Sequence, residues 1–231
     1  MRNLNNALNE IGMILSSDKN IKWNPDLVQF TGDRIITPIG DVSDILLHHK
    51  SKLKDAQTNV SLLSKLIDIL SDMNAILRLD HIGFCYLVAS QESEKRRIKE
   101  LVSKTELHLY QEASNDDGLW LFIGNTVEWE ESMLELIPVE KTDGQWADWV
   151  DYWLPHIQFD VDTKFNSDEI DKMIKDIYGD KTIKPHHIII DGITYIIRIH
   201  LGVIDGVNIF LDLATCARDV KWHREHKLVQ I

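Results

Sequence analysis

The most informative stretch of the sequence is LDHIGFCYLV at residues 79–88, an apolar run with one histidine near its start. A second stretch of the same kind, LPHIQFDV at residues 154–161, carries its histidine 75 residues further along the chain. Short apolar runs of this kind are typical of buried β-strands. Each run is followed by a charged segment whose apolar residues recur at helical spacing. We therefore expect the opening strands of two copies of one structural unit.

The two units continue in the same order after their opening strands. A helix is expected after Ser90 in the first unit and after Asn166 in the second. Strand patterns then follow at 107–111, 119–123 and 133–139 in the first unit, and at 187–190, 195–201 and 207–213 in the second. Three corresponding pairs of residues, at the first strand, the start of the helix and the last strand, lie 75 to 77 positions apart. The sequence thus predicts an α+β fold in which two βαβββ modules form a curved mixed sheet around a cleft.

The rest of the chain is expected to flank this paired domain. Residues 1–77 form a helical N-terminal extension by the spacing of their apolar residues, with irregular chain between Trp23 and Asp41 and a short strand at 34–36. The paired βαβββ domain spans residues 78–231. It divides into module one (78–140), module two (152–215) and a C-terminal tail (216–231) that we expect to be solvated.

Composition limits the partners of the protein. The formal net charge of −12 over 231 residues argues against nucleic acid and anionic membranes, which select for Lys and Arg clusters. The two cysteines form no disulfide framework or thiolate metal motif, and no secretion signal or membrane-spanning run is evident. We expect a cytoplasmic protein.

Four short motifs carry a resemblance to a known superfamily: DHIGF (80–84), MLEL (133–136), PHIQF (155–159) and FLDL (210–213). Between residues 79 and 215 the chain resembles the vicinal oxygen chelate superfamily, which includes glyoxalase I, extradiol dioxygenases and fosfomycin- and bleomycin-resistance proteins. The helical extension looks like that of the YecM-like branch. The resemblance implies a cleft in which His81, Glu135, His156 and Asp212 bind a divalent metal ion. Such members usually have Glu at the last position, so the shorter Asp212 leaves the fourth ligand open.

The chemistry of these side chains can be considered independently of the resemblance. Two imidazoles and two carboxylates suit Ni, Co, Fe, Mn or Zn, and such an ion can act as a Lewis acid toward a small polar substrate. Glu135 is the candidate catalytic base. Burying Glu135 or Asp212 in an apolar strand is costly without a partner, and the partner is either a metal or solvent on an open face. A histidine at the edge of an apolar strand is, taken singly, usually a structural residue.

Strand alternation adds three candidates for substrate binding. Gln158 shares a strand face with His156, and Arg198 shares one with His200, so Arg198 is placed to hold an anionic group unless it is solvated or ion-paired. The leading functional hypothesis is a metal-dependent lyase, isomerase or hydrolase of the vicinal oxygen chelate type. The alternatives are a non-catalytic module that binds or sequesters a small ligand, and a metal-free scaffold or interaction protein. Members of the superfamily often pair modules between chains, so the resemblance implies a homodimer unless the two modules of this chain pair with each other.

Overall fold

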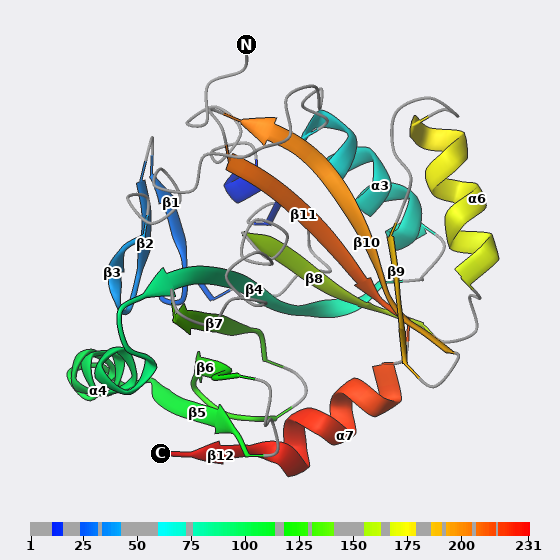
Figure 1. The fold of residues 1–231 in the computed structure, drawn as a ribbon. Coiled ribbons are helices and arrows are strands. Elements are labelled where there is room, and N and C mark those ends of the chain that lie inside the picture. Colours follow the sequence, from blue (N-terminus) through cyan, green and yellow to red (C-terminus); the bar gives the residue numbers. More distant parts are fainter. Residues whose placement is uncertain are drawn as a thin grey trace.

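The computed structural model describes thirteen stretches of the chain, which together hold two sheets and four named helices (Figure 1). These stretches are residues 11–15, 24–31, 34–42, 60–72, 76–113, 118–128, 131–140, 155–162, 167–178, 186–190, 193–204, 207–215 and 217–231. The helices are α3 (Val60–Asp72), α4 (Gln91–Val102), α6 (Ser167–Tyr178) and α7 (Ala217–Lys227). Within the described residues, none of these helices is long and apolar enough to cross a membrane.

A nine-stranded sheet dominates the molecule and contains both predicted modules. Module one supplies β4 (Ile76–Val88), β5 (His108–Glu112), β6 (Leu121–Gly124) and β7 (Met133–Glu140). Module two supplies β8 (His156–Val161), β9 (His186–Ile190), β10 (Ile193–Ile204) and β11 (Val207–Ala214). With α4 after β4 and α6 after β8, each module has the order βαβββ, so the predicted fold class is confirmed.

The two modules meet at their first strands. The sheet order is β12-β5-β6-β7-β4-β8-β11-β10-β9, with β4 antiparallel to β8 at the centre. Each first strand pairs in parallel with the last strand of its own module, β4 with β7 and β8 with β11. The sheet is therefore approximately symmetric about the β4–β8 pair, as expected for a duplication.

Local sequence explains the first helix of module one. The side chain of Ser90 accepts a hydrogen bond from the backbone N–H of Ser93 at 3.4 Å and caps the start of α4. Ile98 and Val102 form the buried side of this helix, which packs against β5 and β7. The predicted cap and apolar stripe are both confirmed.

The N-terminal part differs from the expected helical extension. It contains a three-stranded antiparallel sheet of β1 (Gln29–Thr31), β2 (Arg34–Thr37) and β3 (Gly40–Asp41), where only one short strand was expected. Of the expected helices, residues 11–15 and α3 are described, while 1–10 and 43–59 lie outside the described residues. Strand β4 begins at Ile76, so it extends back across the boundary expected after residue 77.

The C-terminal residues are also more structured than expected. Instead of a solvated tail, they form α7 and then β12 (Leu228–Gln230). Strand β12 pairs antiparallel with β5, so the C-terminal end of the chain returns to module one and forms an edge strand of the large sheet (Figure 1). Buried Leu228 and Arg224 anchor this return, because both side chains are largely removed from solvent.

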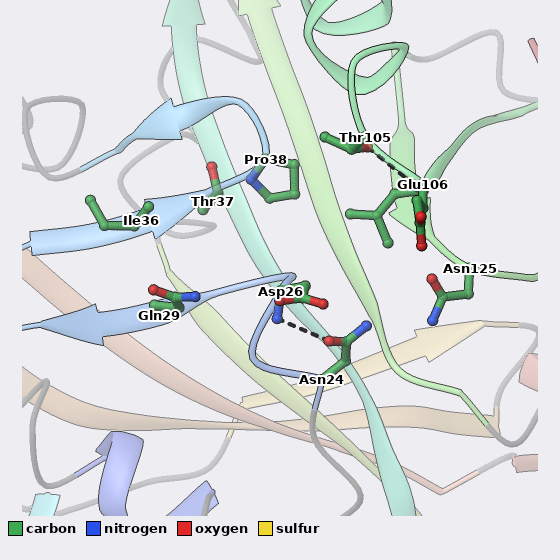
Figure 2. A pocket seen from close by; sticks show the side chains of 10 residues that line it. Asn24, Asp26, Gln29, Ile36, Thr37, Pro38, Thr105, Glu106 and Asn125 are labelled. Atoms are coloured by element: carbon green, nitrogen blue, oxygen red, sulfur yellow. Dashed lines mark hydrogen bonds between the residues drawn. The ribbon is translucent and has the colours of Figure 1, made fainter.

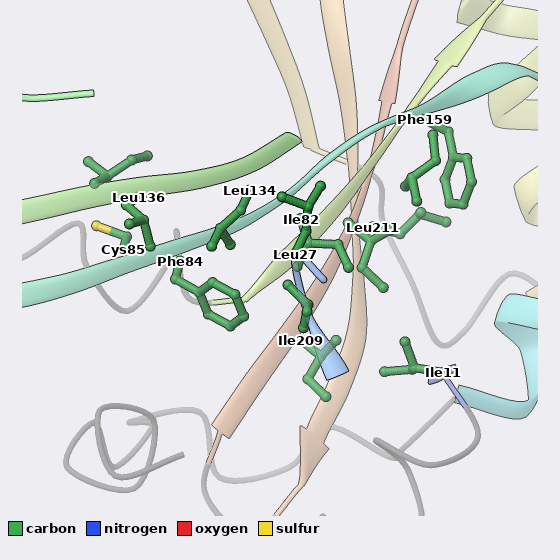
Figure 3. Close-up of a cluster of buried hydrophobic side chains, with 14 of the residues drawn as sticks. Ile11, Leu27, Ile82, Phe84, Cys85, Leu134, Leu136, Phe159, Ile209 and Leu211 are labelled. Atoms are coloured by element: carbon green, nitrogen blue, oxygen red, sulfur yellow. The ribbon is translucent and has the colours of Figure 1, made fainter. Parts of the chain in front are cut away.

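The sheet separates an apolar face from a polar one. Ile82, Phe84, Leu134, Leu136, Phe159 and Leu211 lie in one buried cluster, which also includes Ile11 and Leu27 of the N-terminal part (Figure 3). Because side chains alternate along a strand, the residues between them face the other way. This second face carries His81, Glu135, His156 and Asp212.

Candidate metal centre

Three neighbouring strands bring His81, Glu135 and His156 together. His81 lies on β4, Glu135 on β7 and His156 on β8, and β4 is hydrogen-bonded to both of the other strands. In this register Gly83 lies opposite Glu135 on one side and opposite His156 on the other. The two modules thus contribute to one cluster at their junction.

The potential ligand atoms of these side chains nearly touch. His81 Nε2 lies 3.0 Å from His156 Nε2 and 3.4 Å from Glu135 Oε2. The third separation, between His156 Nε2 and Glu135 Oε2, is 3.1 Å. The three residues are 6%, 6% and 1% exposed for His81, Glu135 and His156, respectively. The cluster therefore lies inside the protein.

These separations fit a shared metal ion. An ion bound about 2.1 Å from each ligand atom keeps neighbouring ligand atoms about 3.0 Å apart in an octahedral arrangement and about 3.4 Å apart in a tetrahedral one. The observed separations of 3.0, 3.1 and 3.4 Å span this range. Among the described residues, this is the group of His, Cys, Asp and Glu whose ligand atoms converge closely enough for one ion. The residues present therefore fit a divalent metal.

Burial and charge set the protonation of two of these groups. Burial lowers the pKa of His81, although the carboxylates of Glu135 and Asp212 oppose this effect. For Glu135, burial alone would raise the pKa, but the neighbouring His81 and a hydrogen bond with His156 outweigh it and hold the pKa below its usual value. A neutral imidazole and an ionised carboxylate are the forms that bind metals.

Gly83 makes the cluster possible and was not among the expected site residues. A Cβ at this position would lie 2.1 Å from His156 Cε1, 2.4 Å from His156 Nε2 and 2.7 Å from Glu135 Oε2. Among the described glycines, only Gly40 has a positive φ. Gly83 is therefore required for the space it leaves and not for its backbone conformation. A glycine inside an apolar strand often marks such a close approach, and this signal was available in the sequence.

The structure places Asp212 differently from the other three expected ligands. Its Oδ1 accepts a hydrogen bond of 2.7 Å from Arg198 Nε, and its Oδ2 accepts a second from Arg198 Nη2. Burial would raise the pKa of Asp212, but the Arg198 guanidinium outweighs it and lowers the pKa. Asp212 is therefore held by a bidentate ion pair and does not join the group of converging ligand atoms.

The three expected substrate-binding residues have different surroundings. Arg198 lies with its guanidinium carbon 5.4 Å from the centre of the Phe210 ring, and the half-buried His200 packs against the same ring at 5.0 Å between centroids. Gln158 turns to Asp80, to which its amide donates a hydrogen bond of 3.2 Å. The ion-paired alternative for Arg198 is the arrangement that the structure contains.

A hollow of about 570 Å³ lies elsewhere, between the N-terminal sheet and the segment that follows α4 (Figure 2). Its lining mixes polar and apolar surface and comes from Asn24, Asp26, Gln29, Ile36, Thr37, Pro38, Thr105, Glu106, Leu107 and Asn125. None of the three clustered residues contributes to it. This hollow is therefore separate from the candidate metal centre.

Comparisons with known proteins find a similar fold but no matching family. No protein-family model matches the chain, and no curated protein matches its sequence. Among solved structures, the fold is similar to the crystal structure of methylmalonyl-CoA epimerase from Mycobacterium tuberculosis, with a TM-score of 0.38 and 17% sequence identity. The similarity covers 61% of this chain and 89% of the epimerase chain. A similarity of this extent assigns the chain to no family.

Proposed function

We propose that His81, Glu135 and His156 bind one divalent metal ion, and that the centre acts on a small polar molecule. The observation that carries this proposal is the convergence of three ligand atoms from three strands to separations of 3.0–3.4 Å. Two imidazoles and a carboxylate without a thiolate favour Ni, Co, Fe, Mn or Zn. The ion is therefore one of these five.

The chemistry is that of a lyase, isomerase or hydrolase of the vicinal oxygen chelate type. When bound, the ion supplies a Lewis acid toward a substrate oxygen. Glu135 is the residue that we assign to proton transfer, because its carboxylate is held in the ionised form and lies 3.1 Å from His156 and 3.4 Å from His81. Arg198, Gln158 and His200 are the candidates for contacts to substrate on the same face. Asp212 serves as a fourth ligand only if its pairing with Arg198 opens.

Metal titration tests the proposal. The chain is stripped with chelator and titrated calorimetrically with Zn²⁺, beside variants His81→Ala and His156→Ala. His187→Ala is a matched control, because His187 is also a strand histidine with a carboxylate partner, Asp171 at 2.9 Å. We expect one equivalent of Zn²⁺ on the wild type and the control, and loss of that equivalent in both cluster variants. Equal Zn²⁺ binding by all four proteins would contradict the proposal.

A second candidate function follows from the low exposure of the cluster. The separations of His156 Nε2 from His81 and Glu135, 3.0 and 3.1 Å, are also lengths of hydrogen bonds, so His156 can donate to either residue without any ion. In that case the cluster stabilises the module junction, and the protein is a scaffold or a non-catalytic ligand-binding module. Wild-type protein that takes up no Zn²⁺ yet loses stability on His156→Ala would favour this function.

Three narrower expectations stay predictions. They are a relation to the YecM-like branch, a cytoplasmic location and a homodimeric assembly. Size-exclusion chromatography with light scattering tests the last of them directly, since a dimer doubles the mass of 26.7 kDa.

A further inference from the structure

A buried carboxylate directly contacts the candidate ligand His81. Asp80 Oδ2 lies 2.6 Å from His81 Nδ1 and accepts a second hydrogen bond of 3.2 Å from Gln158. Asp80 Oδ1 accepts hydrogen bonds from Arg78 and, at 3.1 Å, from Arg224 Nη1 of α7. Both oxygens of this carboxylate are therefore occupied by donors, two of which come from other elements: Gln158 from the neighbouring strand β8 and Arg224 from the C-terminal helix.

The contacts of Asp80 determine which nitrogen of His81 carries the proton. Two guanidinium groups donate to this carboxylate, so it acts as an acceptor throughout. The Nδ1 atom of His81 must then be the donor of the 2.6 Å hydrogen bond. In a neutral imidazole, a proton on Nδ1 leaves Nε2 with a free lone pair, and Nε2 is the atom that faces Glu135 and His156.

The network also fixes Asp80 itself. Arg78 Nε donates a hydrogen bond of 2.7 Å to Asp160, and Arg78 Nη1 donates one of 3.0 Å to the carbonyl oxygen of Glu131. The same carbonyl accepts a hydrogen bond from Arg224, which is 4% exposed and comes from α7. Arg78 and Arg224 are thus both anchored on the carbonyl oxygen of Glu131, and together they hold the Asp80 carboxylate in one orientation toward His81.

We propose that Asp80 is the positioning residue for His81: it holds the ring with Nε2 deprotonated and directed at the metal centre. This inference deepens the proposed function and rests on it for the metal. Carboxylates hydrogen-bonded to the second nitrogen of a ligating histidine generally fix its tautomer and orientation, and their removal costs about 10–100-fold in metal affinity. Arg78 and Arg224 act through Asp80 and keep it in place.

The informative variant is Asp80→Asn, which is nearly isosteric. Its amide oxygen can still accept from Arg78 and Arg224, which turns the NH₂ group toward His81. The ring must then accept at Nδ1 and carry its proton on Nε2, the wrong nitrogen for a ligand. The matched control is Asp160→Asn. It removes a buried carboxylate from the same network, 2.7 Å from Arg78, without a hydrogen bond to His81.

Two measurements on the full chain test the inference. The first is the tautomer of His81 in metal-free protein, read from ¹⁵N chemical shifts of the ring in two-bond ¹H–¹⁵N spectra. We expect Nδ1–H in the wild type and in Asp160→Asn, and Nε2–H in Asp80→Asn. The second is the affinity for Zn²⁺, which we expect to fall by about 10–100-fold in Asp80→Asn and to change less than threefold in Asp160→Asn.

The outcomes separate this inference from the proposed function. A wild type that binds no Zn²⁺ but shows Nδ1–H on His81 would contradict the metal proposal and support the positioning role. A wild type that binds Zn²⁺ with Nε2–H on metal-free His81, or an Asp80→Asn variant with unchanged affinity, would overturn the positioning role. The wild-type spectrum decides the tautomer even if the Asp80→Asn variant does not fold.

Discussion

Replacing Gly83 by Ala should damage the metal centre without removing any ligand. The added Cβ would lie 2.1 Å from His156 Cε1 and 2.7 Å from Glu135 Oε2, whereas ordinary van der Waals contacts are 3.4–4 Å. The His156 ring must therefore move by more than about 1 Å, in surroundings that leave it 1% exposed. Bond lengths at metal sites are kept to within about 0.2 Å, so a ring displaced this far no longer binds the ion.

The expected result has two parts. Overpacking of this kind costs about 1–3 kcal/mol in the free energy of unfolding, measured by urea denaturation of the metal-free protein. The affinity for Zn²⁺, measured by calorimetry, should fall by more than about 100-fold, because a ligand is lost rather than an outer contact. The loss of affinity, and not the loss of stability, is the specific part of this prediction.

Gly124→Ala is the control for the same substitution in the same module. Its Cβ would meet Met133 Cε and Cγ at 3.3 Å, and a flexible methionine side chain can move by the few tenths of an ångström required. We expect wild-type affinity for Zn²⁺ in this variant. Wild-type affinity in Gly83→Ala as well would refute the reasoning, since it would mean that the cluster tolerates a side chain where the structure has no room.

Three further predictions concern stability. Burial raises the pKa of Asp160 from 3.8 to about 6 despite the nearby Arg78. Ionising Asp160 therefore lowers the free energy of unfolding by about 3 kcal/mol, and this loss develops as the pH rises from 4 to 6. Urea unfolding should therefore show Asp160→Asn to be more stable relative to wild type at pH 7 than at pH 4. An equal difference in the free energy of unfolding at both pH values would contradict this. Arg198→Met should cost about 3–5 kcal/mol by leaving the buried Asp212 carboxylate without its bidentate partner, and Arg198→Met/Asp212→Leu should recover most of that loss in the same assay. Phe159→Ala should cost about 3–5 kcal/mol at a fully buried position, whereas Val229→Ala, 49% exposed, should change stability by less than about 0.5 kcal/mol; similar losses would place Phe159 outside the core.

The duplicated pattern was sufficient to predict the architecture of the large sheet. A nearly constant offset between the units places His81 and His156 on equivalent first strands, and these strands pair at the centre of the sheet. The alternation of apolar and polar residues along each strand also predicts which side chains point away from the hydrophobic core. Strand β12 could not be predicted in the same way, because its pairing with β5 depends on how far α7 carries the chain.

The chemistry of the site is less symmetric than the fold, and this explains what the sequence pattern missed. Glu135 lies opposite Gly83, whereas the equivalent Asp212 lies opposite Gln158. Without a side chain at Gly83, Glu135 and His156 can meet above the strand. On the other side Gln158 occupies the equivalent position, and Asp212 pairs with Arg198. An offset between repeats identifies equivalent positions but not the neighbours that decide which carboxylate reaches the histidines.

The most direct test of the account is elemental analysis of the purified protein. The proposed metal centre requires one equivalent of a divalent transition metal per chain in the wild type, and its loss in His81→Ala/His156→Ala. A wild-type chain that contains no such metal and cannot be reconstituted with one, or a double variant that retains the full equivalent, would contradict it.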